Sequence, residues 1–380
     1  MTKVGRFYAL DSFRGLCALC VVVYHMHVTG TITELKFFQN ANLFVEFFFV
    51  LSGFVLAHAY GNKEGIDLKT FFISRTFRLL PLHWFMLAVF VLLESGKLLA
   101  HKKGMSFNNE PFTGYFSPSE LIPNFLLIQS WTDSTEHLSF NFPSWSISIE
   151  YYMYLVFAVI LLMRTKVRYS LWGGLALVAF ADIYSGSDLL TNYAAKGLLC
   201  FFSGALSYIL FAKIKERLTL SNFGFTALEV ASLIAVAATI TSDASNKSMF
   251  TSIIFCAVVI LFAFDAGAIS KLLKREPLSI IGKLSYSIYL THAAILFCIT
   301  SVFMVAEKIF KLNLTPIIAG KNYLDTGSII ANNLTVFLVL FIVILLSSLT
   351  YKYIEMQGQK IGKKIITNRT IQNDASLAKP

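Results

Sequence analysis

The chain has 380 residues, of which 56% are apolar and only 14% are charged, and its mean hydropathy is +0.65. Soluble domains carry about 25% charged residues, so the composition excludes an ordinary soluble protein. The formal net charge is +10. The lysines and arginines gather at the ends of apolar stretches, mostly on one side, as membrane topology requires. Nucleic acid is therefore not an expected partner.

Apolar stretches of about 20 residues recur along the chain, and each is long enough to cross a ~30 Å hydrocarbon layer. The predicted fold is an all-α integral membrane protein, a polytopic bundle of about ten transmembrane helices surrounded by membrane lipids. The first stretch follows Arg6, carries Arg14 within it and has no small-residue cleavage site, so we expect a retained helix. The predicted spans are roughly 7–28, 41–60, 76–96, 142–163, 169–185, 190–212, 223–241, 248–267, 279–306 and 328–354.

The distribution of positive charge predicts the orientation. With the N-terminus inside, 21 of the 32 lysines and arginines fall in cytoplasmic segments and 9 on the opposite side. This bias places both termini in the cytoplasm. The expected organisation is one membrane domain, residues 1–367, followed by a flexible cytoplasmic tail, 368–380. The connection 97–141 is predicted to be external, and no pattern indicates a metal site.

Two ionisable side chains lie in the first span, where hydrocarbon makes them costly. Arg14 and His25 are eleven residues apart, which separates them by roughly 16 Å along a helix. Arg14 is predicted near the inner face and His25 near the outer face. The imidazole can exchange a proton at neutral pH, which favours a catalytic role. The alternative is an interfacial histidine that bonds a backbone carbonyl. Asp11 shares a helix face with Arg14 and is read as structural.

Three further groups are predicted to join His25 between the membrane centre and the outer face: Glu46, Glu150 and His292. Buried ionisable groups mark functional sites, although structural ion pairs give the same pattern. For Glu150 the two interpretations are balanced, and Glu46 is read as structural.

A second group of residues is predicted at the inner face. Arg75 and Arg78 are three residues apart on one helix, an arrangement that can clamp phosphate. The alternative is a topological anchor. Ser52-Gly53 lies inside an apolar helix, where small residues allow close helix approach or open a slot for a narrow ligand.

Taken in order, five segments carry a resemblance: LDSFRGLCALCVVVYH, FFFVLSGF, SRTFRLLP, PSWSISIEYYMY and GKLSYSIYLTH. With them the chain resembles the acyltransferase-3 family of membrane O-acyltransferases, which modify bacterial surface polysaccharides such as lipopolysaccharide O-antigen. The resemblance implies ten core helices. It also implies an acyl-CoA donor, most simply acetyl-CoA, and a lipid-linked or surface polysaccharide acceptor in the bacterial cytoplasmic membrane.

The resemblance also implies residue roles. His25 matches the essential first-helix histidine and Arg14 its arginine partner. Arg75 and Arg78, with Ser52 beside them, match the donor-binding region. The remaining matches are Trp145, Ser148, Glu150, Tyr289 and His292. Towards the C-terminus, Tyr353–Gln357 matches a closing element with Met356 and Gln357 in place of lysine and proline, and no role is assigned to it.

The predicted function is transfer of an acyl group from cytosolic acyl-CoA to a sugar hydroxyl outside, with His25 as general base and Glu150 orienting its ring. No metal is expected in this chemistry. Two alternatives remain: a transporter that uses the intramembrane charges as a relay, and a non-catalytic partner of a polysaccharide synthesis complex.

Overall fold

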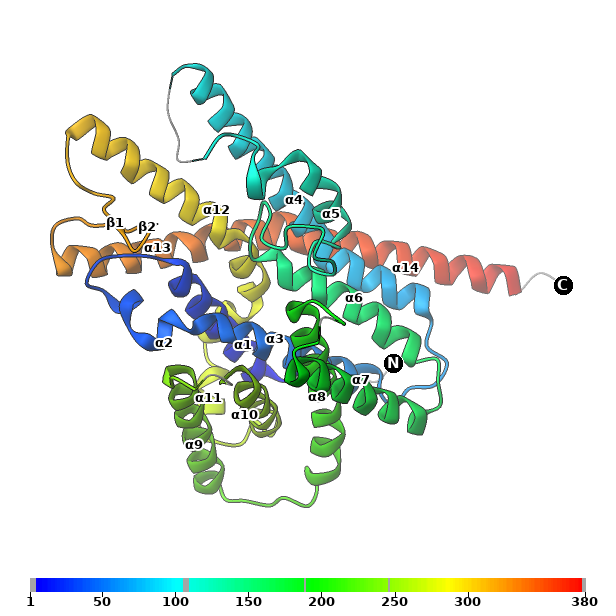
Figure 1. Cartoon of the computed structure of the whole chain (residues 1–380). Helices are drawn as coiled ribbons and strands as arrows, with labels where there is room; N and C mark the ends of the chain where they lie inside the picture. The colour runs from blue at the N-terminus through cyan, green and yellow to red at the C-terminus, as the bar shows by residue number, and fades with distance from the viewer. Residues whose placement is uncertain (1–4, 105–108, 188, 245–246, 378–380) are drawn as a thin grey trace.

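The computed structural model describes residues 5–104, 109–187, 189–244 and 247–377 (Figure 1). Within these ranges the chain is helical except for loops and one hairpin, β1 (Ile317–Ile318) paired antiparallel with β2 (Lys321–Asn322). The helices are α1 (Tyr8–His25), α2 (Lys36–Gln39), α3 (Phe44–Tyr60), α4 (Leu68–Lys102), α5 (Leu121–Leu126), α6 (Ser144–Ile160), α7 (Thr165–Ser185), α8 (Asn192–Ile214), α9 (Asn222–Thr241), α10 (Lys247–Phe262), α11 (Ala268–Leu273), α12 (Leu278–Phe310), α13 (Ile329–Thr350) and α14 (Met356–Leu377).

The prediction of an all-α membrane protein is confirmed. Among the described residues, six helical stretches are long and apolar enough to cross a membrane, which is fewer than the ten predicted. They are Ala41–Tyr60, Leu68–Lys102, Asn192–Ile214, Asn222–Thr241, Leu278–Phe310 and Ile329–Ile371. The other four predicted spans also contain helices, α1, α6, α7 and α10, which are 18, 17, 21 and 16 residues long.

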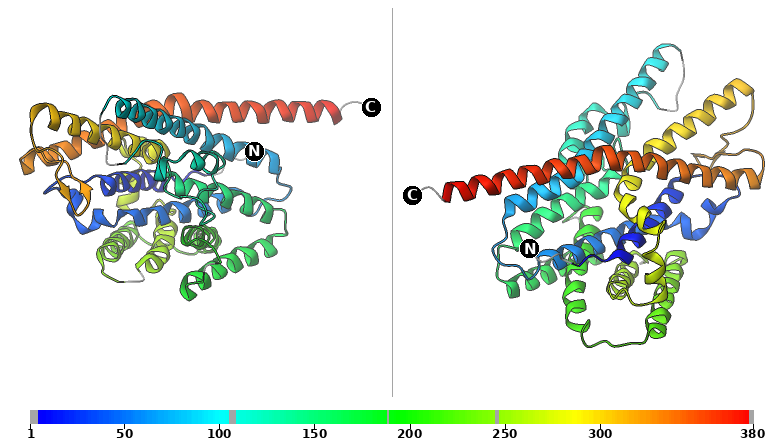
Figure 2. Two further views of the ribbon diagram at one scale, coloured as in Figure 1. Left: turned by 45° about the horizontal axis from the view of Figure 1, so that its top comes forward. Right: turned by 180° about the vertical axis from the view of Figure 1, so that it is seen from behind.

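The C-terminal part of the chain is helical. A π-helical turn, Tyr351–Glu355, joins α13 to α14, and the three form one long rod that crosses the molecule (Figures 1 and 2). The red end of α14 extends beyond the rest of the protein in both views of Figure 2. Helix therefore continues through Leu377. The predicted flexibility of residues 368–380 stays a prediction. Gly358 and Gly362 of α14 lie closely against Pro81 and Phe77 of α4, which explains how the helix is held there.

Two helix pairs approach each other closely through glycine. In the first pair, a Cβ on Gly15 of α1 would lie 2.6 Å from the backbone carbon of Ile281. A Cβ on Gly282 of α12 would lie 2.7 Å from the backbone oxygen of Asp11. The contact of Arg14 with Ser285 is followed further along both helices by that of His25 with His292, so α1 and α12 run parallel. Close backbone approach at small residues is a common way for helices to associate in membranes.

The second pair is α3 and α8. A Cβ on Gly53 would lie 1.8 Å from the backbone oxygen of Phe201, and one on Gly204 would lie 2.0 Å from that of Val50. Of the two uses considered for the Ser52-Gly53 pair, Gly53 therefore serves helix packing. The neighbouring Ser52 lies on a different face of α3 and lines a cavity.

Candidate active site

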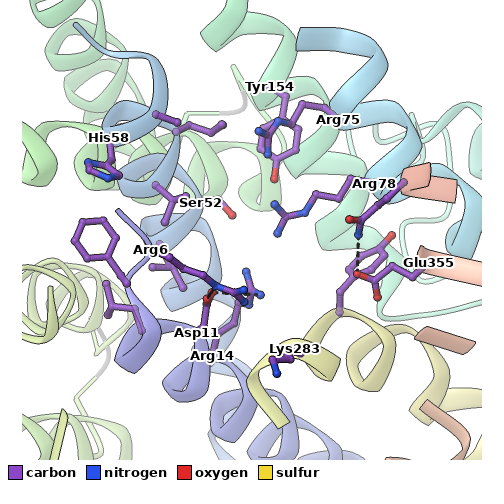
Figure 3. A pocket seen from close by; sticks show the side chains of 18 of the residues that line it. Arg6, Asp11, Arg14, Ser52, His58, Arg75, Arg78, Tyr154, Lys283 and Glu355 are labelled. Carbon is purple, nitrogen blue, oxygen red and sulfur yellow. Dashed lines mark hydrogen bonds and ion pairs between the residues drawn. The ribbon is translucent and has the colours of Figure 1, made fainter. Parts of the chain in front are cut away.

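A cavity of about 690 Å³ lies on the side of the bundle that holds the N-terminal segment, called the inner side below (Figure 3). Its wall combines the start of α1, the end of α3, the first turns of α4 and α12, and the turn between α13 and α14. The volume lies within the range of small-molecule sites. The lining side chains with charge are Arg6, Asp11, Arg14, Arg75, Arg78, Lys283 and Glu355.

Five of these seven side chains are cationic, so the cavity is suited to an anion. Arg78 makes no hydrogen bond or ion pair with the described residues, and its guanidinium group points towards the middle of the cavity in Figure 3. Arg75 packs its guanidinium group on the rings of Tyr60, Phe71 and Tyr154 at 5.6–5.9 Å. The buried Nε atom of Arg75 has no partner among the described residues. Two arginines with free donor capacity are what a phosphate group requires.

Arg14 is held more firmly. Its Nε donates to Oγ of Ser285 on α12 at 2.8 Å, and its Nη2 lies 3.7 Å from Oδ1 of Asp11. Asp11 also accepts from Nε of Arg6 at 2.5 Å. The structure thus supports the structural interpretation of Asp11, which anchors two arginines at the cavity wall.

A second, narrow cavity continues from the first. Arg14, Ser52, Arg78 and Tyr286 line both. Glu150 lies in the wall of the second cavity, where its carboxylate accepts from Oγ of Ser52 at 2.5 Å and from the hydroxyl of Tyr154. The far end of this cavity is lined by Ser146 and Tyr289, whose hydroxyl groups lie 2.9 Å apart.

Beyond Tyr289 lies a pair of histidines. The ring of Tyr289 is 6.0 Å from that of His292, and Nε2 of His292 is 3.1 Å from Nδ1 of His25. The cavity lining stops at Tyr289 and does not include His25. The aromatic ring of Phe142 covers the pair, with its centroid 4.5 Å from that of His25.

The glycine contact between α1 and α12 explains why the two histidines meet. His25 is ten residues after Gly15, and His292 is ten residues after Gly282. On parallel helices, equal offsets from one contact bring side chains to the same level, roughly 15 Å further along. The same contact places Arg14 beside Ser285, which lies near the beginning of this interval.

One arrangement of protons satisfies the polar contacts of the pair. Nδ1–H of His292 donates to the carbonyl of Ile288 at 3.2 Å, so its Nε2 is an acceptor in the neutral ring. Nδ1–H of His25 then donates to His292 and to the carbonyl of Val21 at 3.0 Å. This tautomer leaves the lone pair of His25 on Nε2, which has no partner among the described residues. A half-buried imidazole in this state is prepared to accept a proton.

The predicted partnership between Glu150 and His25 is wrong. Glu150 bonds Ser52 and Tyr154, and the place beside the His25 ring belongs to His292. The reason is depth, because Glu150 lies at the level of Ser52, in the middle of α3. Of the other matched residues, Ser148 donates to the carbonyl of Leu127 at 2.5 Å and fixes the segment around α5.

Several lining residues were not predicted. Tyr154, Tyr286, Lys283 and Glu355 face the inner cavity. Glu355 accepts from Oγ of Ser287 at 2.8 Å and from Nε2 of Gln359 at 3.2 Å. The π-helical turn that orients Glu355 leaves no pattern in the sequence. Among the described residues, no group of three or more His, Cys, Asp or Glu side chains is placed to hold a metal ion.

These features define a class: a membrane protein with a cationic inner cavity that leads towards a histidine pair on the opposite side. Comparison with known proteins shows the family. The profile of the acyltransferase-3 family, described as an acyltransferase domain, matches residues 7–352, so the chain belongs to this family.

Three curated relatives illustrate the similarity. Peptidoglycan O-acetyltransferase OatA of Listeria monocytogenes is 22% identical over 378 residues, covering 83% of this chain and 57% of that protein. Putative peptidoglycan O-acetyltransferase YrhL of Bacillus subtilis is 24% identical over 364 residues, covering 83% and 53%. Acyltransferase MdmB of Streptomyces mycarofaciens is 31% identical over 197 residues, covering 48% and 46%. The chain thus spans about half the length of these relatives. No solved structure matches it.

Proposed function

We propose that this chain is a membrane O-acetyltransferase that moves an acetyl group from acetyl-CoA at the inner side to a sugar hydroxyl at the outer side. The proposal rests on the order in which three features follow one another through the bundle. Unpaired arginines come first, then two cavities with shared walls, and then the histidine pair. The inner side is the cytoplasm of a bacterium, with both termini there. The ten helices α1, α3, α4, α6, α7, α8, α9, α10, α12 and α13 cross the membrane.

The donor fits the inner cavity by charge. The phosphates of coenzyme A meet Arg75 and Arg78, whose guanidinium donors are free. The pantetheine arm follows Ser52 and Arg14 into the second cavity, with the thioester directed towards Tyr289. Movement of this ring opens the last part of the passage to His25.

The chemistry follows from the tautomer of His25. Its Nε2 removes the proton of a sugar hydroxyl, and the hydroxyl oxygen attacks the thioester carbonyl carbon. A C–O bond forms, the C–S bond breaks, and the thiolate of coenzyme A leaves and takes up the proton. General base catalysis of this kind contributes on the order of 10²–10⁴-fold. Transfer through an acyl-imidazole starts from the same lone pair.

The acceptor is a surface or lipid-linked glycan. Two relatives carry peptidoglycan in their names, so peptidoglycan is the first acceptor to test. Lipopolysaccharide O-antigen is the second.

The decisive assay mixes purified protein, labelled acetyl-CoA and a soluble peptidoglycan disaccharide, and measures alkali-labile acetyl ester by mass spectrometry. We expect ester with the wild type, none with His25→Ala, and normal rates with His27→Ala, since His27 stacks on Tyr323 instead. A near wild-type rate with His25→Ala would overturn the assignment of the base. In proteoliposomes, a transporter would move label without making ester.

A further inference from the structure

A strip of aromatic rings lies at the outer side, next to the histidine pair. The ring of His137 is 4.4 Å from that of Tyr193, and Tyr193 is 4.7 Å from Trp145. Trp145 in turn contacts the buried ring of Phe49 at 6.2 Å. His137, Tyr193 and Trp145 are all half-buried, so each keeps part of its surface exposed.

The strip lies close to His25, through Phe142 and Tyr24. The backbone N–H of Trp145 donates to the carbonyl of Phe142, and the ring of Phe142 lies 4.5 Å from His25. Tyr24, the neighbour of His25 in α1, lies with its ring 4.6 Å from the imidazole. The neighbours of the proposed base, Phe142 and Tyr24, therefore lie next to residues of the strip.

Polar groups border the rings. Nδ1 of His137 is 3.4 Å from Oε1 of Glu136, and these side chains are 32% and 38% exposed. The hydroxyl of Tyr193 is within electrostatic range of Glu136, Tyr24 and Tyr115. The surface thus combines ring faces with a carboxylate, an imidazole and phenol groups.

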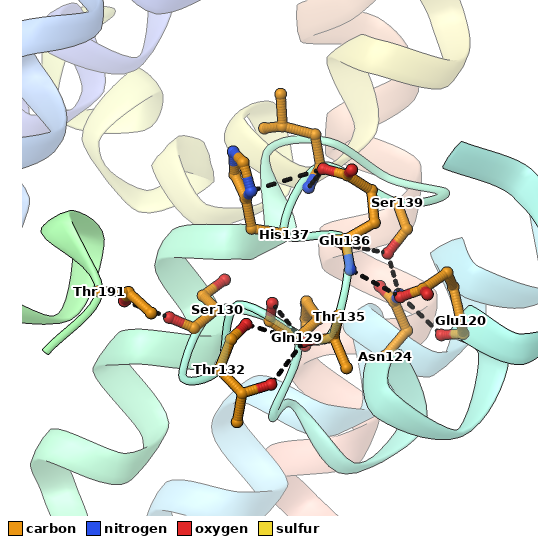
Figure 4. A network of polar contacts seen from close by, with 11 residues as sticks. Glu120, Asn124, Gln129, Ser130, Thr132, Thr135, Glu136, His137, Ser139 and Thr191 are labelled. Atoms are coloured by element: carbon orange, nitrogen blue, oxygen red, sulfur yellow. Dashed lines mark hydrogen bonds and ion pairs between the residues drawn. The ribbon is translucent and has the colours of Figure 1, made fainter. Parts of the chain in front are cut away.

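The loop that carries Glu136 and His137 is fixed by the network in Figure 4. The amide of Glu136 donates to Oε2 of Glu120 at 2.9 Å, and Oγ of Ser139 donates to the carbonyl of Glu136 at 2.5 Å. Nδ2 of Asn124 donates to Oγ of Ser139 at 2.6 Å. The loop also contacts α8, because Oγ1 of Thr191 donates to the carbonyl of Ser130. Because the loop is already held in place, binding a ligand would cost little conformational entropy.

We propose that the strip formed by His137, Tyr193 and Trp145, with Glu136 at its border, binds a pyranose ring of the acceptor glycan. This inference rests on the function proposed above and adds the place of the acceptor. A pyranose has an apolar C–H face that stacks on aromatic rings and hydroxyl groups at its edge that bond carboxylate and phenol. Lipid would use the ring faces alone and would disfavour Glu136 and His137.

An aromatic pair elsewhere shows the contrast with a membrane-interface belt. Phe180 and Tyr184, at the end of α7 near the outer side, stack at 6.2 Å, and Tyr184 is 80% exposed. Among the described residues, none with a charged side chain pairs with the rings of Phe180 and Tyr184. Such aromatics are typical of the interface between lipid and water. Tyr184 is therefore the matched control for Tyr193.

The test measures the KM for the peptidoglycan disaccharide and for acetyl-CoA separately. Tyr193→Leu keeps the bulk and removes the ring face. We expect the acceptor KM to rise roughly tenfold, equivalent to ~1.4 kcal/mol, with the acetyl-CoA KM and kcat unchanged. His137→Leu is a second variant with the same expectation, and Tyr184→Leu leaves every parameter unchanged. An unchanged acceptor KM in both variants would overturn the proposal, as would an equal rise in Tyr184→Leu.

Binding of the disaccharide without acetyl-CoA, followed by saturation-transfer NMR, separates this inference from the proposed reaction. Binding that is lost in Tyr193→Leu supports the strip even if no ester is formed. If the wild type forms ester and Tyr193→Leu still binds the disaccharide, the proposed function stands but the strip is not the acceptor site.

Discussion

Nε2 of His292 lies 3.1 Å from Nδ1 of His25, although 267 residues separate the two in the chain. His292 in turn donates from Nδ1 to the carbonyl of Ile288. This chain of contacts fixes which nitrogen of His25 carries its proton. The residue that orients the proposed base is therefore a second histidine, in the position that a carboxylate occupies in serine hydrolases.

Replacing His292 tests this positioning role. His292→Ala removes the acceptor for Nδ1–H of His25, and we expect kcat to fall by up to roughly 10⁴-fold, the effect of losing the group that sets the tautomer of a catalytic imidazole. His292→Gln keeps an acceptor oxygen near the position of Nε2 and should recover part of the rate. The pH profile of kcat/KM should shift in His292→Ala and return towards the wild type in His292→Gln. If His292→Ala and His292→Gln have the same kcat and the same pH profile, His292 has only a packing role.

The inner arginines are expected to bind the donor. Arg75→Ala and Arg78→Ala should each weaken acetyl-CoA binding roughly 10- to 150-fold, because each removes a charge-assisted hydrogen bond of about 1.5–3 kcal/mol. Calorimetry with the purified protein measures this directly. Arg164→Ala is the control, since Arg164 is an exposed arginine on the same side, outside the cavity. Unchanged affinity in both cavity variants would exclude them from the donor site.

The glycine contact between α1 and α12 is expected to control activity through the histidine pair. A Cβ on Gly15 would lie 2.6 Å from the backbone of Ile281, so Gly15→Ala should force the helices apart. Overpacking of this kind costs about 1–3 kcal/mol. We expect a lower unfolding temperature. We also expect catalytic activity to fall by a larger factor than the affinity for acetyl-CoA. Gly173→Ala, where nothing lies within 4 Å, should change neither.

Glu150 is expected to stabilise the wall between the two cavities. Glu150→Ala leaves the hydroxyl groups of Ser52 and Tyr154 without their acceptor, at a cost of about 1–3 kcal/mol for a buried group. The unfolding temperature should therefore fall, while the pH profile of the remaining activity stays that of the wild type. Glu64→Ala, at an exposed glutamate, is the control for stability. A shifted pH profile in Glu150→Ala would restore the link to His25.

Much of the fold is readable from the sequence, because hydrocarbon imposes long apolar stretches that leave a strong pattern. Helices occupy all ten predicted spans, although only six helical stretches in the described part of the chain are long and apolar enough to cross a membrane. The extension of helix to Leu377 was not readable, since Gly358 and Gly362 act through a contact with α4 that only the folded chain reveals.

The site was readable in part. Arg75 and Arg78 share a helix face in sequence and a cavity in the structure. The histidine pair has a signal in the sequence, because His25 and His292 each follow a glycine by ten residues. The contact of Glu150 with Ser52 has no such signal in the sequence. It depends on how far α3 and α6 are displaced along each other.

The most direct test of the account uses proteoliposomes with acetyl-CoA enclosed on the side of the termini and the glycan acceptor only on the other side. The account predicts acetyl ester on the external glycan with the wild type and none with His25→Ala. Equal ester formation when acetyl-CoA is supplied only from the glycan side, or ester formation by His25→Ala, would contradict transfer through the bundle to His25.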